Sequence, residues 1–251
     1  MQRFFVPPTA IQNDRVTLTG PVVHQLTHVL RLSPGQRIVV LDDSGWEYTV
    51  ELQRLGRGQA EGQIVERWEA QGEPRTRLTL YQAVLKGERF AWVLQKGTEL
   101  GIAAFVPLLC ARNVVRDPAA VRQKLPRWQA IVREAAEQAR RGRLPRLAAP
   151  LPFAEACAQA QAAGGLSLLA WEEETATSLK ATLRAGLSNL QLPTSNIQLF
   201  IGPEGGFTPD EVALAQAQGI RPVSLGRRIL RAETAGLVAA AIIFYELDDL
   251  S

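Results

Sequence analysis

The segment IQLFIGPEGGFT, residues 197–208, narrows the choice of fold more than any other stretch of the chain. Its first five residues form a largely apolar run, which is typical of a strand buried on both faces of a sheet. Three glycines then fall within five residues, and Thr208 and Pro209 supply the N-cap and first-turn proline of a helix. This order indicates a βα unit that exposes bare backbone at the carboxyl end of its strand.

Two interpretations of this glycine turn stay open when it is taken alone. An ordinary tight turn also needs glycine, and the segment matches neither the GxGxxG nor the Walker A pattern. A second segment, LGRRILRAETAG at residues 225–236, places Arg231, Glu233 and Thr234 at the start of an apolar helix, which Glu233 or Thr234 could simply cap. Two such loops after two strands favour a binding site, because ligands of open α/β sheets collect at strand carboxyl ends.

From residue 77 onward, apolar runs alternate with longer amphipathic segments, which predicts an α/β fold with a parallel sheet. We expect strands at residues 78–85, 105–109, 166–171, 197–201 and 221–225. Helices are expected at residues 88–100, 126–141, 152–163, 208–219 and 234–247.

The first 70 or so residues follow a different rhythm of short alternating runs and turns. They predict strands at residues 4–6, 16–18, 37–41, 46–55 and 60–68, one helix at residues 22–32, and together a small β-barrel. A polar stretch at residues 69–74 has the composition of a linker. We therefore expect two domains, at residues 1–72 and 73–251.

Charge is distributed unevenly along the 251 residues. The composition, 46% hydrophobic and 21% charged, excludes wholesale disorder, and the net charge is only +3. Residues 112–146, however, carry ten basic and three acidic side chains, whereas residues 147–251 have a net charge of −5. Arginine supplies 24 of the 28 basic residues, which suits phosphate contacts but also follows from a GC-rich genome.

The expected helix at residues 126–141 carries much of this basic stretch. Its apolar residues recur at helical spacing and predict one buried stripe, made of Trp128, Ile131, Val132, Ala135, Ala136 and Ala139. A charged opposite face is commonly just solvated, with weak pairs such as Arg133 and Glu137. That interpretation explains the helix but not the positive surplus, so we expect the turn at residues 140–143 to bind phosphate.

The cysteines and histidines exclude several kinds of chemistry. Cys110 and Cys157 stand alone, which is typical of buried residues in a reducing compartment. His24 and His28 lie one helical turn apart, but no glutamate follows His24 and no third ligand is near, so zinc chemistry is rejected and no metal is expected. Because both histidines precede the α/β domain, a Ser/His/Asp site within that domain is excluded.

Targeting signals are also missing from the sequence. The first residues lack the apolar core of a signal peptide, and the longest apolar stretch, residues 235–245, is too short to span a bilayer. A cytoplasmic protein without membrane partners is therefore expected.

Taken together, six short motifs resemble one known family. They are RFFV at residues 3–6, VLR at 29–31, QKGTELG at 95–101, EAAEQ at 134–138, IGPEGGF at 201–207 and LGRRILRAETA at 225–235. In this order and spacing the chain resembles the bacterial small-subunit ribosomal RNA uracil-N3 methyltransferases of the SPOUT class. Gly97 and Ala139 depart slightly from the family pattern, and neither replaces a charged group.

The resemblance implies a fold, a cofactor and partners. It implies a PUA-like RNA-binding barrel at residues 1–72 and, at residues 73–251, a domain with a deep trefoil knot that binds S-adenosylmethionine and forms a homodimer. The substrate would be 16S ribosomal RNA or the small ribosomal subunit. Carried over by position, the cofactor site comprises Leu169, Ala170, Ile201, Gly202, Pro203, Glu204, Gly205, Gly206, Ser224, Leu225, Gly226, Ile229, Leu230, Arg231 and Thr234.

Roles in catalysis and RNA binding follow as hypotheses. Arg231 or Arg141 would stabilise negative charge on the uracil oxygens, and Glu137 or Glu233 would assist removal of the N3 proton. RNA contacts are expected from Arg3, Arg31, Arg140, Arg141 and Arg143.

Two alternatives remain at this stage. A related SPOUT enzyme could methylate a different nucleotide or a transfer RNA. A non-enzymatic RNA-binding protein would keep the barrel and the basic turn but would need neither glycine loop, and binding of S-adenosylmethionine separates it from an enzyme.

Overall fold

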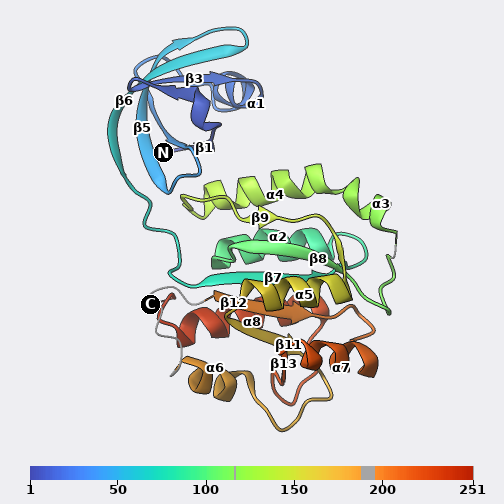
Figure 1. The fold of residues 1–251 in the computed structure, drawn as a ribbon. Coiled ribbons are helices and arrows are strands. Elements are labelled where there is room, and N and C mark those ends of the chain that lie inside the picture. The colour runs from blue at the N-terminus through green and yellow to red at the C-terminus, as the bar shows by residue number, and fades with distance from the viewer. Residues whose placement is uncertain (116, 188–195, 251) are drawn as a thin grey trace. The chain divides into compact units, whose positions relative to one another are not determined.

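In a computed structural model, which describes residues 1–115, 117–187 and 196–250, the chain forms two compact units. The first consists of Met1–Glu73 with Ala136–Leu144, and the second of Pro74–Ala135 with Pro145–Ser251. Figure 1 shows strands and short helices at the amino-terminal end, followed by alternating strands and helices. The chain thus changes architecture close to the expected linker.

The first unit is built on a six-stranded sheet with the order β1-β4-β5-β6-β3-β2. Its strands are β1 (Arg3–Phe5), β2 (Ile11–Gln12), β3 (Arg15–Thr19), β4 (Arg37–Leu41), β5 (Trp46–Leu55) and β6 (Gln59–Glu69). Only β1 and β4 pair in parallel. All five expected strands form, whereas the two-residue β2 is too short to leave a sequence pattern. Within the described residues the end strands β1 and β2 do not pair. Apolar side chains of β1, β3, β4, β5 and β6 nevertheless share one buried cluster.

The expected helix of the first unit is broken in two. It consists of α1 (Pro21–His24) and the π-helical segment η2 (Gln25–Val29), and a short 3₁₀ turn, η1 (Pro8–Ala10), precedes β2. In η2 the amide of Leu30 bonds to the carbonyl of Gln25, five residues back. This wider turn rotates Val29 outward, to 65% exposure, although regular helical spacing predicts it on the buried face.

The second unit contains a seven-stranded, all-parallel sheet, as predicted. Its main order is β10-β8-β7-β12-β11-β13, and β9 pairs with β8. The strands are β7 (Arg77–Ala83), β8 (Ala104–Leu109), β9 (Arg146–Leu147), β10 (Leu151–Pro152), β11 (Leu166–Ala170), β12 (Asn196–Ile201) and β13 (Arg221–Val223). The sequence patterns did not predict the two-residue strands β9 and β10.

Helices cover both faces of this sheet (Figure 1). They are α2 (Arg89–Leu100), α3 (Pro118–Arg122), α4 (Leu125–Gln138), α5 (Phe153–Ala163), α6 (Leu179–Leu187), α7 (Pro209–Ala217) and α8 (Ala232–Glu246). Side chains of α2, α4, α6 and α8 pack in one buried cluster, and those of α5 and α7 pack in another. The sequence patterns missed α3 and α6. Among the described residues, no helix is long and apolar enough to cross a membrane.

Both cysteines are buried, as the sequence predicts. Burial, together with the nearby charge of Glu211, raises the pKa of Cys157 to about 12 and that of Cys110 further. A thiol with a raised pKa contributes stability below its unfolded-state pKa, and this contribution is lost as the pH rises.

We therefore predict that neither thiol of the native protein reacts with Ellman's reagent at pH 8, whereas both react in urea. The free energy of unfolding should also fall as the pH rises above about 9, where the thiols of the unfolded chain ionise. Rapid reaction of the native protein at pH 8 would show that a thiolate is accessible.

Candidate active site

Three loops converge where neighbouring parallel strands end. Ala170, the last residue of β11, pairs with Ile201 of β12 on one side and with Val223 of β13 on the other. The loops that follow these strands therefore begin side by side. Together with Arg89 they line a cavity of about 520 Å³. The two loops chosen from the sequence thus meet at one site, as the position of strand ends predicts.

The loop after β12 takes its shape from two glycines. A Cβ atom on Gly202 would lie 3.2 Å from the Phe207 ring. Gly206 has a φ of +69°, and a Cβ there would overlap the carboxylate of Glu172. The amide of Gly206 donates to the carbonyl of Pro203, which closes a tight turn before α7. Side chains other than glycine would strain this wall of the cavity.

Backbone hydrogen bonds fasten the loop after β11 to the end of β13. The amide of Trp171 donates to the carbonyl of Val223 at 3.1 Å. Further along, the amide of Ser224 donates to Thr177, and the amide of Leu179 donates to Ser224. Backbone hydrogen bonds therefore join the loop after β11 to the loop after β13.

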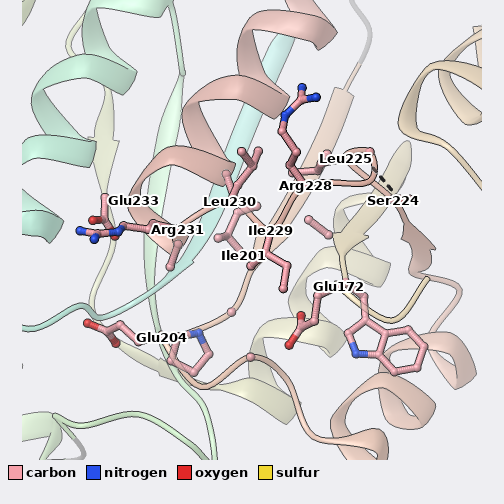
Figure 2. Close-up of a pocket in the computed structure, with 18 of the residues that line it drawn as sticks. Glu172, Ile201, Glu204, Ser224, Leu225, Arg228, Ile229, Leu230, Arg231 and Glu233 are labelled. Atoms are coloured by element: carbon pink, nitrogen blue, oxygen red, sulfur yellow. Dashed lines mark hydrogen bonds between the residues drawn. The ribbon is translucent and has the colours of Figure 1, made fainter. Parts of the chain in front are cut away.

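Charged side chains gather at one end of the cavity. Nη1 of Arg89 lies 3.3 Å from a carboxylate oxygen of Glu204, and its Nε lies 3.8 Å from one of Glu233. Figure 2 shows Glu204, Arg231 and Glu233 at this end, Glu172 and Ser224 at the other, and apolar side chains between them. Arg89 is about half exposed, so these ion pairs contribute little stability and chiefly orient the carboxylates.

Two buried polar atoms of the lining have no hydrogen-bond partner within the described chain. They are Nε1 of Trp171 and Oε2 of Glu233. Buried polar groups are normally paired, so each is a place where a bound molecule could donate or accept. The described residues contain no group of three or more His, Cys, Asp or Glu side chains that could hold a metal ion.

Comparison with known proteins decides the family. The model of an RNA methyltransferase domain matches residues 72–244, and that of an RNA methyltransferase PUA domain matches residues 18–65. The chain is 42% identical over 241 residues to the ribosomal RNA small subunit methyltransferase E of Synechocystis, covering 96% of this chain and 76% of that protein. This chain belongs to the ribosomal RNA small subunit methyltransferase E family.

Further relatives agree over the whole length. The family member from Bacillus subtilis is 33% identical, with 99% of this chain and 98% of that protein covered. A crystal structure of the Neisseria gonorrhoeae member, bound to S-adenosyl methionine, superposes with a TM-score of 0.84 at 32% identity and 98% coverage of both chains. The predicted α/β fold with its parallel sheet and amino-terminal PUA-like domain is therefore confirmed.

Twelve of the fifteen residues predicted for the family's cofactor site line the cavity. The exceptions in the described chain are Leu169, Gly205 and Thr234. Leu169 is fully buried among apolar side chains beneath the sheet, because it precedes the last residue of β11. Gly205 turns outward, where its missing side chain leaves room for Arg112.

The sequence also missed several lining residues. They are Arg89, Trp171, Glu172, Arg227, Arg228, Ala232 and Ala235, and Glu233 was predicted for catalysis rather than for lining. Trp171 and Glu172 follow β11 directly, so the rule that sites form at strand ends could have found them. Arg89 begins α2, far from the glycine loops in sequence, and gave no signal of its own.

The four predicted catalytic residues are divided between the two units. Arg231 and Glu233 line the cavity, whereas Glu137 and Arg141 belong to the first unit. Glu137 accepts a hydrogen bond from the amide of Phe5 at 2.9 Å. Helix α4 ends at Gln138, earlier than predicted, because Arg140 adopts a left-handed conformation with a φ of 57°.

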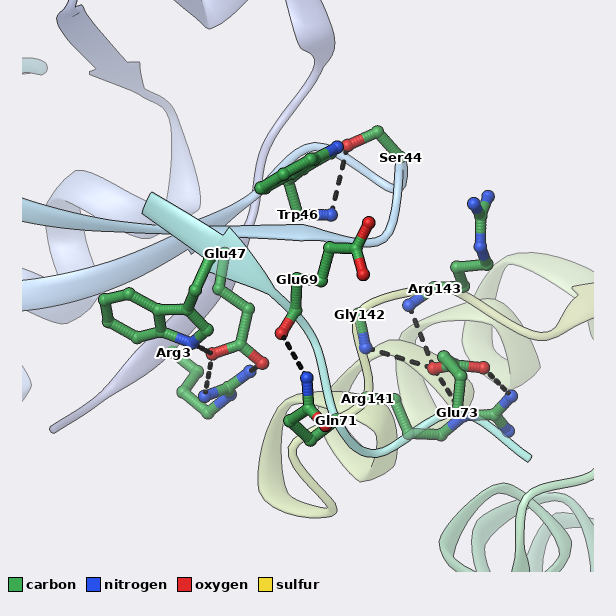
Figure 3. Close-up of polar contacts among 11 residues, drawn as sticks. Arg3, Ser44, Trp46, Glu47, Glu69, Gln71, Glu73, Arg141, Gly142 and Arg143 are labelled. Atoms are coloured by element: carbon green, nitrogen blue, oxygen red, sulfur yellow. Dashed lines mark hydrogen bonds and ion pairs between the residues drawn. The ribbon is translucent and has the colours of Figure 1, made fainter. Parts of the chain in front are cut away.

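Arg141, which the sequence analysis predicts to contact RNA, is 2% exposed. Its guanidinium binds both carboxylate oxygens of Glu73, and Glu73 also accepts from the amides of Gly142 and Arg143 (Figure 3). Arg3 is similarly engaged, because it pairs with the buried Glu47. Charge counting cannot distinguish such buried arginines from solvated ones.

Of the arginines predicted to bind RNA, the structure leaves Arg31, Arg140 and Arg143 exposed. Arg143 extends beside the turn at Gly45, where its guanidinium donates to the carbonyl of Asp43 at 3.4 Å. The predicted phosphate-binding turn therefore keeps two of its three arginines on the surface.

We predict that Arg141→Met lowers the free energy of unfolding in urea by about 2–3 kcal/mol, because charged hydrogen bonds to Glu73 are lost. Arg140→Met, on the exposed neighbour, should change it by less than about 0.5 kcal/mol. Equal stability of the two variants would contradict this structural role, and a reduced salt dependence of RNA binding for Arg141→Met would support the RNA contact predicted from the sequence.

Proposed function

We propose that this chain transfers a methyl group from S-adenosylmethionine to N3 of a specific uridine in the 16S RNA of the small ribosomal subunit. The observation that carries the proposal is the cavity at the ends of β11, β12 and β13, with Arg231 and Glu233 at one end. Family membership supplies the RNA methyltransferase class. The choice of uracil N3 rests on the resemblance of the motifs.

The cavity fits S-adenosylmethionine in size and chemistry. About 520 Å³ is within the range of cofactor sites. Ile201, Leu225 and Leu230 supply apolar surface for adenine, and the free Nε1 of Trp171 supplies a donor. Carboxylates of Glu172, Glu204 and Glu233 suit a cationic ligand. When bound, S-adenosylmethionine supplies an electrophilic methyl group.

The residues at the charged end would act on the acceptor base. Uracil N3 carries a proton that must leave, and Oε2 of Glu233 is buried without a partner and can accept it. The guanidinium of Arg231 would stabilise the negative charge that then develops on the uracil oxygens. Arg89 holds Glu204 and Glu233 in place from the other side. Alignment of donor and acceptor by these walls would supply much of the acceleration.

Of the two bases suggested by the sequence, the structure favours Glu233. Its carboxylate lines the cavity, whereas that of Glu137 is occupied by a backbone amide in the first unit. Arg231 is favoured over Arg141 in the same way, because Arg231 lines the cavity whereas the guanidinium of Arg141 is bound to Glu73.

The remaining family features complete the proposal. Residues 1–72 would bind RNA, and residues 73–251 would carry out methyl transfer as one half of a homodimer in the cytoplasm. A deep trefoil knot would form around the cavity. In support, the chain leaves β12, which lies between β7 and β11, and must pass β11 to reach β13.

Transfer of tritiated methyl groups tests the proposal. The purified protein with labelled S-adenosylmethionine should label small ribosomal subunits from cells that lack the gene, and not large subunits or transfer RNA. Including free 16S RNA shows whether the assembled subunit is needed. Labelling of transfer RNA alone would favour the related-enzyme alternative, and binding of RNA without any transfer would favour a non-enzymatic RNA-binding protein.

A further inference from the structure

The glycine loop at residues 202–208 is held from outside the cavity by one arginine. Nη1 of Arg112 donates to the carbonyl of Gly205 at 2.9 Å and to that of Phe207 at 3.4 Å. Arg112 does not line the cavity, and it lies about 90 residues away from this loop in the sequence. Both hydrogen bonds reach carbonyl groups of residues next to Gly206, and Gly206 lines the cavity whereas these two residues do not.

Each peptide group that Arg112 holds is also held at its opposite end. The peptide between Gly205 and Gly206 donates its amide hydrogen to the carbonyl of Pro203 at 3.0 Å. The peptide between Phe207 and Thr208 donates its amide hydrogen to Oε2 of Glu211 at 2.9 Å. Since a trans peptide is planar, fixing its oxygen and its N–H sets the orientation of the whole group. The two fixed planes flank Gly206 and Phe207 and so set the loop conformation.

The segment that carries Arg112 is itself anchored on both sides. On one side, the amide of Ala111 donates to Glu211 at 2.8 Å. On the other, the buried Asn113 donates to the carbonyl of Val84 and accepts from the amide of Cys110. Hydrogen bonds of its two neighbours thus hold the backbone on both sides of Arg112, and its side chain links this segment to the glycine loop.

The absence of a side chain at Gly205 also favours the contact with Arg112. A Cβ atom on Gly205 would lie 3.2 Å from Cβ of Arg112. Glycine at this position therefore permits the close approach of Arg112, and does not make room inside the cavity as the sequence predicts for it.

We propose that Arg112 is a positioning residue for the methyl-donor site, which fixes the glycine loop in its binding conformation. The proposal rests on the proposed cofactor site. Without Arg112, the two peptide groups could rotate, and cofactor binding would have to order the loop again. Arg112 touches none of the residues assigned to the acceptor base, so its loss should weaken cofactor binding and leave the methyl-transfer step itself intact.

Calorimetry with S-adenosylmethionine tests this on the full chain. Arg112→Ala should raise the Kd roughly ten- to hundredfold, the range expected for lost charged hydrogen bonds. Arg112→Lys should recover part of the affinity, since an ammonium group can still reach one carbonyl. With saturating cofactor, kcat should stay within about twofold of wild type. Arg122→Ala is the matched control, because Arg122 is also exposed but lies on α3. This variant should bind S-adenosylmethionine normally.

Hydrogen exchange provides a readout independent of the ligand. In Arg112→Ala and Arg112→Lys without cofactor, the amides of Gly206 and Thr208 should exchange faster, while those of β12 stay unchanged. Unchanged Kd and unchanged exchange at these amides would overturn the proposal. If the wild-type protein fails to bind S-adenosylmethionine, the proposed function is wrong. Hydrogen exchange at the amides of Gly206 and Thr208 then still shows whether Arg112 fixes the loop.

Discussion

Arg231→Ala is expected to lower the rate of methyl transfer at saturating cofactor and RNA by about a hundredfold or more, the usual cost of losing one donor that stabilises developing charge. The variant should fold normally, because the hydrogen bonds that Arg231 makes at the start of α8 come from its backbone and not from its side chain. Its carbonyl accepts from the amides of Thr234 and Ala235, both at 2.8 Å, and its side chain makes no capping hydrogen bond.

A single-turnover assay with labelled cofactor measures this effect separately from product release. Arg221→Ala is the matched control, because Arg221 is exposed at the amino end of β13, away from the loops that line the cavity. Turnover of Arg231→Ala within about threefold of wild type would remove Arg231 from the proposed mechanism.

Gly206→Val is expected to abolish measurable binding of S-adenosylmethionine. The φ of +69° is strained for any residue with a side chain and most strongly for a β-branched one. The new side chain would also displace the Glu172 carboxylate, which lines the same cavity. Both effects act on the wall of the proposed methyl-donor site.

Gly219→Val separates backbone strain from the loss of the site. Gly219 has a φ of +77°, its Cβ would meet nothing within 4 Å, and it does not line the cavity. Calorimetry should therefore show normal affinity for Gly219→Val. Equal losses in the two variants, or normal binding by Gly206→Val, would contradict the assignment of the cavity.

The sequence predicted the parts of the site that lie in continuous segments. The loops after β12 and β13 were predicted because glycine, caps and apolar runs leave local patterns. The fifteen cofactor-site residues followed from the family resemblance, and twelve of them line the cavity. Arg89 was missed because it reaches the site only through the pairing of β7 with β12. Such long-range pairing leaves no local pattern.

Burial distinguishes charged residues that look alike in the sequence. Arg141 and Arg143 stand two residues apart in the same basic turn, yet one is buried against Glu73 and the other is exposed. The sequence showed the excess of charge but not the carboxylate that faces it, which lies 68 residues earlier. Gly205 and Gly206 illustrate the same limit, because adjacent glycines face opposite sides of one loop.

Mass-spectrometric mapping of 16S RNA tests directly whether this chain methylates uracil N3. Small subunits from cells that lack the gene would be incubated with the protein and S-adenosylmethionine, and the RNA digested to nucleosides and to fragments. We expect 3-methyluridine at a single position, absent without the protein and absent with Arg231→Ala. Methylation of another base, of a ribose hydroxyl, or of no nucleotide at all would contradict it.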